Sequence, residues 1–242
     1  MCRITVPGER SGRLIMEEKM TTVLFQGDSL TDACRDKEPG NDPNRFLGVG
    51  YVNHIAQVLM SENPEVRVLN HGVNGNRIMD LYARWIEDTL NVDFQVLSIL
   101  CGVNDVGFDL RMNKGADPEK FGFIYDRMLY EVKQARPDAA LVLCEPFLCR
   151  LKPEEVSYGT DIIENWEIWY GRIRKEADIV GKLAEKYGAV LVPSRKLFED
   201  ACRRAPASFW SVDGIHLTPA GNGLLAGEWL RCAKGAGNGP VW

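Results

Sequence analysis

Three polar residues have the side-chain types that nucleophilic catalysis uses. Ser29 stands in Gln26-Gly-Asp-Ser-Leu30, directly after an apolar run, so its hydroxyl and its own N–H would be exposed at the end of a strand. Asp213 precedes His216 by three residues, and a carboxylate at that spacing can reach the imidazole across one turn. A serine hydroxyl needs a base to take its proton, and imidazole titrates near neutral pH. Each feature alone also has a simpler interpretation, as a helix cap for Ser29 and as a structural or metal-binding pair for Asp213 and His216.

Two further motifs follow apolar runs in the same way. Gly75 comes soon after a run that ends at Asn70, and Asn104 belongs to Gly102-Val-Asn104-Asp105, after another run. Alone, Gly75 is most simply a tight turn and Asn104 a turn former.

The apolar runs before these motifs are typical of strands in a parallel sheet. They are short, and stretches with helical periodicity separate them; the five expected strands are 22–26, 66–70, 94–100, 140–144 and 189–192. Strands that alternate with helices indicate βαβ crossovers and a sheet covered on both faces. We therefore expect an α/β protein: a three-layer α/β/α flavodoxin-like sandwich with a five-stranded parallel sheet. Its ligand site would lie beyond the carboxyl ends of the strands.

Helical periodicity is clearest in four stretches. Apolar residues recur at three- and four-residue intervals in 52–59, 121–132, 162–187 and 218–229, and Asp117-Pro118 and Thr218-Pro219 are typical helix starts. No repeat or linker divides the chain. We expect a single domain over residues 21–242, preceded by residues 1–20 as an N-terminal arm or as a segment upstream of the natural start.

Taken together, the four motifs are specific. Those of Ser29, Gly75 and Asn104 follow the first three expected strands, so they should meet at one edge of the sheet, to which the stretch with Asp213 and His216 can return. In content and order they resemble the four blocks of the SGNH (GDSL-type) hydrolase superfamily, over about residues 23–229. Within it the chain is most similar to bacterial carbohydrate acetylesterases of the acetyl-xylan-oligosaccharide type.

The resemblance implies acyl transfer through a covalent acyl-enzyme. Ser29 would be the nucleophile, His216 the base, and Asp213 the carboxylate that fixes the imidazole tautomer. The backbone N–H groups of Ser29 and Gly75 and the side-chain amide of Asn104 would form the oxyanion hole. This chemistry requires no metal and no cofactor.

Three other residues are candidates for contact with the substrate. Asp28 is next to the expected nucleophile, Arg77 is close to Gly75, and Trp210 could stack on a sugar ring. Each has an alternative. Asp28 could hold its loop through backbone N–H groups, Arg77 could pair with a nearby acid, and Trp210 could pack in the core.

Two long stretches resist regular structure, 32–50 and about 145–160, and loops of this length are usually functional or mobile. The first leaves the expected nucleophile directly, so we expect it to form one wall of the substrate pocket, with Phe46 or Leu47 over the oxyanion site.

Composition excludes several classes of protein. The 29 basic and 34 acidic residues give a net charge of −5 at pH 7 without a long basic block, so we expect no nucleic-acid partner. No apolar run approaches the roughly 18 residues of a membrane-spanning helix, so we expect no membrane partner. Seven cysteines without a Cys-x-x-Cys pair favour neither a disulfide framework nor a zinc site, and His54 and His71 have no ligand spacing. With no apolar signal segment at the start, we expect a cytoplasmic protein.

We therefore expect a serine esterase that hydrolyses short-chain, acetyl esters and removes O-acetyl groups from sugars or oligosaccharides. The alternatives are a lysophospholipase or acyl-thioesterase of the same superfamily, and a non-catalytic binder of carbohydrates or small molecules. The natural substrate stays open, because loops determine specificity on this scaffold. An aromatic helix face with Trp166, Trp169 and Tyr170, together with the resemblance, favours a homo-oligomer.

Overall fold

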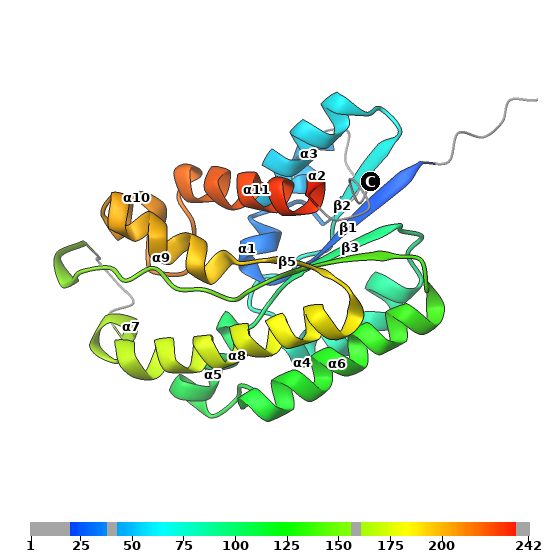
Figure 1. Cartoon of the computed structure of the whole chain (residues 1–242). Coiled ribbons are helices and arrows are strands. Elements are labelled where there is room, and N and C mark those ends of the chain that lie inside the picture. The colour runs from blue at the N-terminus through cyan, green and yellow to red at the C-terminus, as the bar shows by residue number, and fades with distance from the viewer. Residues whose placement is uncertain (1–19, 38–42, 156–160, 236–242) are drawn as a thin grey trace, which may run out of the picture.

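A computed structural model describes residues 20–37, 43–155 and 161–235 (Figure 1). Its five strands form one parallel sheet in the order β2-β1-β3-β4-β5. The strands are β1 (Thr21–Gly27), β2 (Val66–Asn70), β3 (Val96–Leu100), β4 (Ala140–Cys144) and β5 (Val190–Val192). This order is that of a flavodoxin-like sheet, so the predicted α/β/α sandwich with five parallel strands is confirmed.

Helices cover both faces of the sheet, as Figure 1 shows. One face packs against α1 (Ser29–Asp32), α2 (Pro43–Leu47), α3 (Tyr51–Glu62), α9 (Ser194–Arg204), α10 (Ala207–Trp210) and α11 (Pro219–Lys234). The other packs against α4 (Ile78–Ala83), the π-helix η1 (Ile86–Leu90), α6 (Pro118–Ala135) and α8 (Trp166–Tyr187). Helices α5 (Val103–Met112) and α7 (Asp161–Glu164) pack against α8, and a 3-10 turn, η2 (Pro153–Glu155), follows β4.

Side chains of each strand alternate between the two apolar layers. In β3, Val96 packs toward α3 and α11, whereas Leu97 and Ile99 pack toward α6 and α8. Trp229 of α11 is fully buried and donates its indole N–H to the hydroxyl of Ser98 on β3, at 2.9 Å. The β3 strand is therefore buried on both faces, which explains its nearly continuous apolar sequence.

Local sequence explains where two of the predicted helices begin. The Asp117 carboxylate accepts two N–H groups of the first turn of α6, at 2.9 and 3.0 Å, and the Thr218 hydroxyl accepts one from the first turn of α11, at 3.2 Å. Proline follows each cap, where its missing N–H leaves no bond unmade. These two starts are confirmed.

The predicted arm lies outside the described residues, apart from Met20. Within the part of the chain that the structure describes, no helix is long and apolar enough to cross a membrane. In that same part, no group of three or more His, Cys, Asp or Glu side chains is arranged to hold a metal ion.

The central strand should dominate stability. Ile99 is fully buried in β3, so Ile99→Ala should lower the free energy of unfolding by roughly 2–5 kcal/mol through lost burial and an unfilled cavity. Ile86→Ala removes the same atoms from an exposed position on η1 and should change the free energy of unfolding by about 0.5 kcal/mol or less. Urea unfolding followed by circular dichroism measures both. Equal losses would show that β3 does not carry the core as described.

Candidate active site

Ser29 begins α1 directly after β1 ends at Gly27. Asp28 is the N-cap of this short helix, and its Oδ1 accepts the N–H of Leu30 at 3.0 Å. A β-carbon at Gly27 would overlap the carbonyl oxygen of Leu100, on the neighbouring strand β3. The chain can therefore turn this close to β3 only with glycine, and the turn places Ser29 at the carboxyl edge of the sheet.

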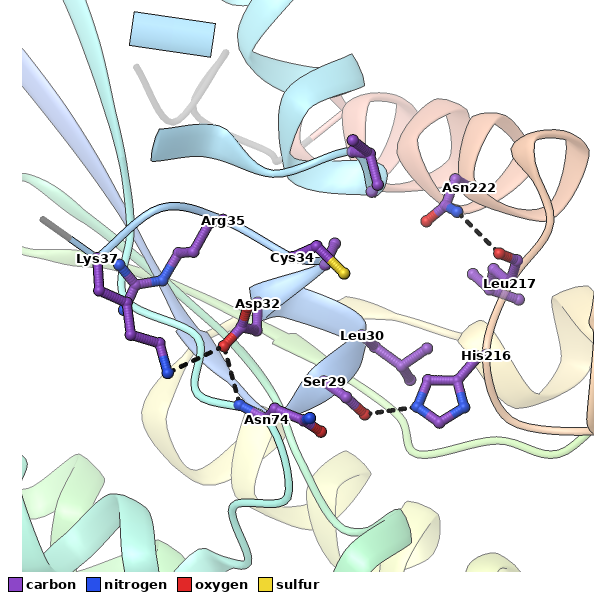
Figure 2. Close-up of a pocket in the computed structure, with 13 residues that line it drawn as sticks. Ser29, Leu30, Asp32, Cys34, Arg35, Lys37, Asn74, His216, Leu217 and Asn222 are labelled. Atoms are coloured by element: carbon purple, nitrogen blue, oxygen red, sulfur yellow. Dashed lines mark hydrogen bonds and ion pairs between the residues drawn. The ribbon is translucent and has the colours of Figure 1, made fainter. Parts of the chain in front are cut away.

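Ser29, His216 and Asp213 form a continuous chain of hydrogen bonds. Oγ of Ser29 lies 2.8 Å from Nε2 of His216 (Figure 2), and Nδ1 of His216 lies 2.6 Å from Oδ2 of Asp213. The His216 side chain is 47% exposed, whereas that of Asp213 is 16% exposed. The imidazole can thus meet a substrate while the carboxylate is shielded. The geometry is the one that the predicted triad requires, and the catalytic roles stay a prediction.

The loop that carries Asp213 and His216 is held by its own hydrogen bonds. Oδ1 of Asp213 accepts the N–H groups of Ile215 at 2.9 Å and of His216 at 2.7 Å. The Ser211 hydroxyl donates to the carbonyl oxygen of His216 at 2.8 Å and accepts the N–H of Gly214 at 2.9 Å. Gly214 has a φ of +93°, which favours glycine. The loop that carries the imidazole is therefore held in one conformation by these hydrogen bonds.

The same contacts determine where these groups titrate. The hydrogen bond with Asp213 raises the pKa of His216 above its ordinary value. Burial alone would raise the pKa of Asp213, but the hydrogen bonds from the imidazole and from two backbone N–H groups outweigh burial and lower it. A carboxylate therefore faces the imidazole at neutral pH and stabilises the imidazolium that forms when His216 takes a proton.

The other expected oxyanion donors follow the two strands that flank β1. Gly75 follows β2 with a φ of +78°, and no heavy atom lies within 4 Å of the position of a β-carbon there. Asn104 lies in the first turn of α5, directly after β3. The parallel order β2-β1-β3 thus places Gly75, Ser29 and Asn104 at one edge. That their donors converge on one point stays a prediction.

Helix α5 also holds the turn that contains Gly75. The amide Nδ2 of Asn104 donates to the carbonyl oxygen of Asn76 at 3.1 Å, and the Asp105 carboxylate accepts the N–H of Ile78 at 3.0 Å. An asparagine amide has two hydrogens, so Asn104 can anchor this turn and still donate to an oxyanion.

Two buried carboxyl groups lie behind the site. Asp28 is 1% exposed and Asp105 is fully buried. Burial raises the pKa of Asp28 to about 7 and that of Asp105 to about 8, because water no longer stabilises the ionised forms. Oδ2 of Asp28 has no hydrogen-bond partner among the described residues.

The candidates for substrate contact fall into different environments. Asp28 is buried and caps α1, so the alternative of a loop-holding carboxylate describes it, and direct substrate contact does not. Arg77 pairs with Asp80 through Nε at 2.7 Å and Nη2 at 2.8 Å, yet it also lines a cavity of about 410 Å³ next to Gly75. Trp210 packs against the core and donates its indole N–H to Ala201 at 3.0 Å, as its core alternative predicts.

A larger cavity, of about 480 Å³, opens at the triad (Figure 2). It is lined by Ser29, Leu30, Asp32, Ala33, Cys34, Arg35, Lys37, Val49, Gly50, Asn74, His216, Leu217 and Asn222. Asn74 also lines the cavity that contains Arg77, so the two cavities adjoin at the turn before Gly75. The sequence motifs did not single out Asn74, Arg35, Lys37 or Asn222 as site residues.

The stretch 32–50 does form a wall of this cavity, but through other residues than expected. Its ends contribute the lining residues from Asp32 to Lys37, with Val49 and Gly50. Phe46 and Leu47 are not among the lining residues, and Leu47 packs against the core beside α3. Residues 38–42 and 156–160, within the two stretches expected to be irregular, lie outside the described residues.

Comparison with known proteins places this geometry in a family. The model of the GDSL-like Lipase/Acylhydrolase family matches residues 25–224. The chain belongs to this family. The matched range contains all five residues predicted for the triad and the oxyanion hole, and membership makes the protein a carboxylic ester hydrolase.

Individual relatives of this GDSL-like acylhydrolase include an acetylxylan esterase from Geobacillus stearothermophilus. It is 30% identical over 217 residues, which are 86% of this chain and 92% of the relative. A solved structure of a GDSL-like lipase from Parabacteroides merdae ATCC 43184 is 32% identical, with a TM-score of 0.79 over 88% of this chain and 95% of that one. The structure of a catalytic mutant of the acetylxylan esterase is 25% identical, with a TM-score of 0.75 over the same shares.

Asn104 should contribute mainly to the chemical step. Its amide would bond an oxyanion more strongly than the carbonyl of the bound ester, so Asn104→Ala should lower kcat about a hundredfold and change KM little. Steady-state hydrolysis of p-nitrophenyl acetate measures both, with Gln57→Ala, an exposed amide on α3, as the control. An unchanged kcat with a raised KM would make Asn104 a substrate-binding residue instead.

Asp28 should make stability depend on pH. Its folded-state pKa of about 7 lies above the ordinary 3.8, so the folded protein holds a proton that the unfolded chain releases between these values. The free energy of unfolding should then fall as pH rises from 4 to 7, by up to about 1.4 kcal/mol per pH unit for this group. Asp28→Asn keeps the oxygen that caps the helix but cannot ionise. Between pH 5 and 7 the free energy of unfolding of this variant should therefore fall less than that of wild type. Urea unfolding at several pH values measures this, with Asp138→Asn, at an exposed position, as the control. The same dependence of the free energy of unfolding on pH in wild type and Asp28→Asn would refute the prediction.

Proposed function

We propose that this protein is a serine esterase that removes acetyl groups from sugars or oligosaccharides through an acyl-enzyme on Ser29. The observation that carries the proposal is the hydrogen-bonded series Ser29–His216–Asp213, whose serine and histidine line a cavity of about 480 Å³. The likeness to an acetylxylan esterase over most of both chains supports the acetylated-sugar substrate.

Acylation begins when Nε2 of His216 takes the proton of Ser29 Oγ. The oxygen then attacks the ester carbon, and the carbonyl oxygen becomes an oxyanion that the N–H groups of Ser29 and Gly75 and the Asn104 amide stabilise. As the C–O bond to the sugar breaks, the imidazolium returns its proton to the leaving sugar oxygen. Asp213 holds the ring in the orientation needed for both transfers.

Deacylation repeats these steps with water. His216 takes a proton from a water molecule, the hydroxide attacks the acetyl carbon, and the second tetrahedral intermediate collapses with the proton returned to Ser29 Oγ. Acetate leaves and the free hydroxyl is restored. His216 acts as a base only when it is neutral. Because its pKa is raised, the rate should begin to fall at a higher pH than it would for an unpaired imidazole as the solution is acidified.

The cavity has hydrogen-bonding side chains that a sugar could use. Its volume of about 480 Å³ is within the ~300–1,000 Å³ of small-molecule sites, and most of its lining side chains are polar or charged. His216 lines it, and His216 must reach the leaving oxygen. The sugar would therefore occupy this cavity, with hydrogen bonds to side chains such as Asn74 and Asn222.

A cytoplasmic location and a homo-oligomeric state remain part of this proposal. Of the aromatic residues that favoured an oligomer, Trp169 is buried against α5, whereas Trp166 stacks on Tyr170 with ring centroids 5.1 Å apart. Beside them Ile168 is 56% exposed, which leaves an apolar surface on α8 that a second subunit could cover.

Acetate release from a panel of acetylated sugars, xylo-oligosaccharides and small esters tests the function. Wild type should release acetate from the saccharides and should prefer p-nitrophenyl acetate to the octanoate. Ser29→Ala should lower kcat by roughly 10³-fold or more, because the nucleophile is lost, while circular dichroism stays unchanged.

Ser61→Ala, which changes an exposed serine on α3, is the matched control and should keep the wild-type rate. A clear preference for octanoate would favour the lysophospholipase or thioesterase alternative. Ester hydrolysis that survives Ser29→Ala would remove the mechanism.

A further inference from the structure

Two cationic side chains line the cavity that contains the expected nucleophile. Figure 2 shows Arg35 and Lys37 toward one end of the view and His216 toward the other, with Ser29 between them. Among the lining residues that the structure describes, Asp32 is the sole acid. The wall formed by Arg35, Lys37 and Asp32, here called the basic wall, therefore has a net positive charge.

Arg35 uses one of its donors within the protein. Its Nε donates to the carbonyl oxygen of Gly72 at 2.9 Å, and no carboxylate among the described residues forms an ion pair with its guanidinium. The side chain is nevertheless half-buried, and burial lowers the pKa of Arg35. A guanidinium keeps its charge at neutral pH, so this cation is partly desolvated without a direct ion pair, although the charges of Asp32 and Asp88 act on it.

Asp32 is shared between two cations, Arg35 and Lys37, so the three residues together keep a net charge of +1. Nζ of Lys37 lies 3.6 Å from Oδ2 of Asp32, and the same oxygen accepts the N–H of Asn74 at 3.0 Å. The nearest other charges, Arg84 and Asp88, pair with each other at 2.9 Å and so contribute one of each sign. Arg35 therefore lines a cavity large enough for more than an acetyl group, and its two Nη groups have no partner among the described residues.

We propose that the basic wall binds a carboxylate of the substrate, so that the preferred substrate is an acetylated saccharide with a uronate unit beside the acetylated sugar. The inference rests on the proposed function and narrows its substrate class. A guanidinium presents two parallel N–H groups at the spacing of the two carboxylate oxygens, and Lys37 adds a point charge at the same end. The acetyl ester would then reach Ser29 while the uronate lies against Arg35.

A matched pair of substrates tests this proposal. One is an O-acetylated neutral disaccharide and the other is the same compound with a uronate as the neighbouring sugar; a third has a phosphate ester in place of the carboxylate. Wild type should show a kcat/KM for the uronate about tenfold above that for the neutral compound. The ratio should shrink when NaCl rises from about 0.05 to about 0.5 M, because salt screens partly exposed charges.

The ratio within each variant is the readout. It should fall toward 1 in Arg35→Gln and to an intermediate value in Arg35→Lys, which keeps the charge but not the fork. Arg127→Gln, an exposed arginine on α6 that pairs with Glu131, should keep the wild-type ratio. Because Lys remains charged and flexible, Arg35→Lys also provides the test if Arg35→Gln fails to fold.

Three results would overturn the proposal: equal rates on the neutral and uronate compounds in wild type, a ratio that survives Arg35→Gln, or a preference for the phosphate over the carboxylate. The second would show that Arg35 serves only to hold Gly72. If wild type hydrolyses p-nitrophenyl acetate but releases acetate from neither saccharide, the proposed function itself fails. Equal activity on both saccharides is a different outcome, because it would refute only the preference for a uronate and leave the proposed function intact.

Discussion

The position of β1 between β2 and β3 in one parallel sheet is the constraint on which the site depends. The register pairs Phe25 with Asn70 and Gly27 with Leu100, so the three strands end at nearly the same level. Their following turns therefore begin side by side, although they are far apart in sequence. The absence of a side chain at Gly27 lets the first turn pass close to β3. Only then can Ser29 lie between the turns that contain Gly75 and Asn104.

Buried carboxyl groups are the main departure of this fold from an apolar interior. Besides Asp28 and Asp105, Glu176 of α8 is fully buried, and neither of its carboxyl oxygens has a hydrogen-bond partner among the described residues. Burial also raises the pKa of Glu176 well above its usual range. Its carboxyl packs on Gly102, just before Asn104. In their protonated forms these groups place no negative charge behind an oxyanion hole, where such a charge would oppose the charge of the intermediate.

Much of the architecture could be predicted from sequence because its signals are local. The apolar runs predict all five strands, and caps such as Asp117 predict helix starts. The helices α4, α5 and α9 were not among the predicted stretches. In α9, for example, Leu197, Phe198, Ala201 and Cys202 do form an apolar face at helical spacing, but the helix has only 11 residues and is rich in charged side chains, so this short signal was missed.

The candidate site also has a part that the sequence predicts and a part that it does not. Ser29, Gly75 and Asn104 follow strand ends, so their positions depend on the sheet order, whereas Asp213 and His216 lie on the loop between α10 and α11 that returns to the same edge. The cavity wall depends on how loops fold back, which no periodicity encodes. Phe46 and Leu47 were expected over the site, yet α2 forms there and directs Leu47 into the core, while charged residues from 32–37 face the cavity instead. Asp28 was a candidate for substrate contact, but its position as helix cap buries it.

Hydrogen bonds join the basic wall to the connection between β2 and Gly75. Arg35 bonds the carbonyl of Gly72, and Asp32 bonds the N–H of Asn74, so two residues of the wall hold the connection that leads to Gly75. A substrate group bound by Arg35 or Lys37 would therefore act on the same connection that is expected to supply an oxyanion donor. Binding energy from a part of the substrate remote from the ester can then be used to position that donor, and its effect would appear in kcat as well as in KM. Under both proposals, substrate specificity and stabilisation of the transition state would be linked through the residues between β2 and α4.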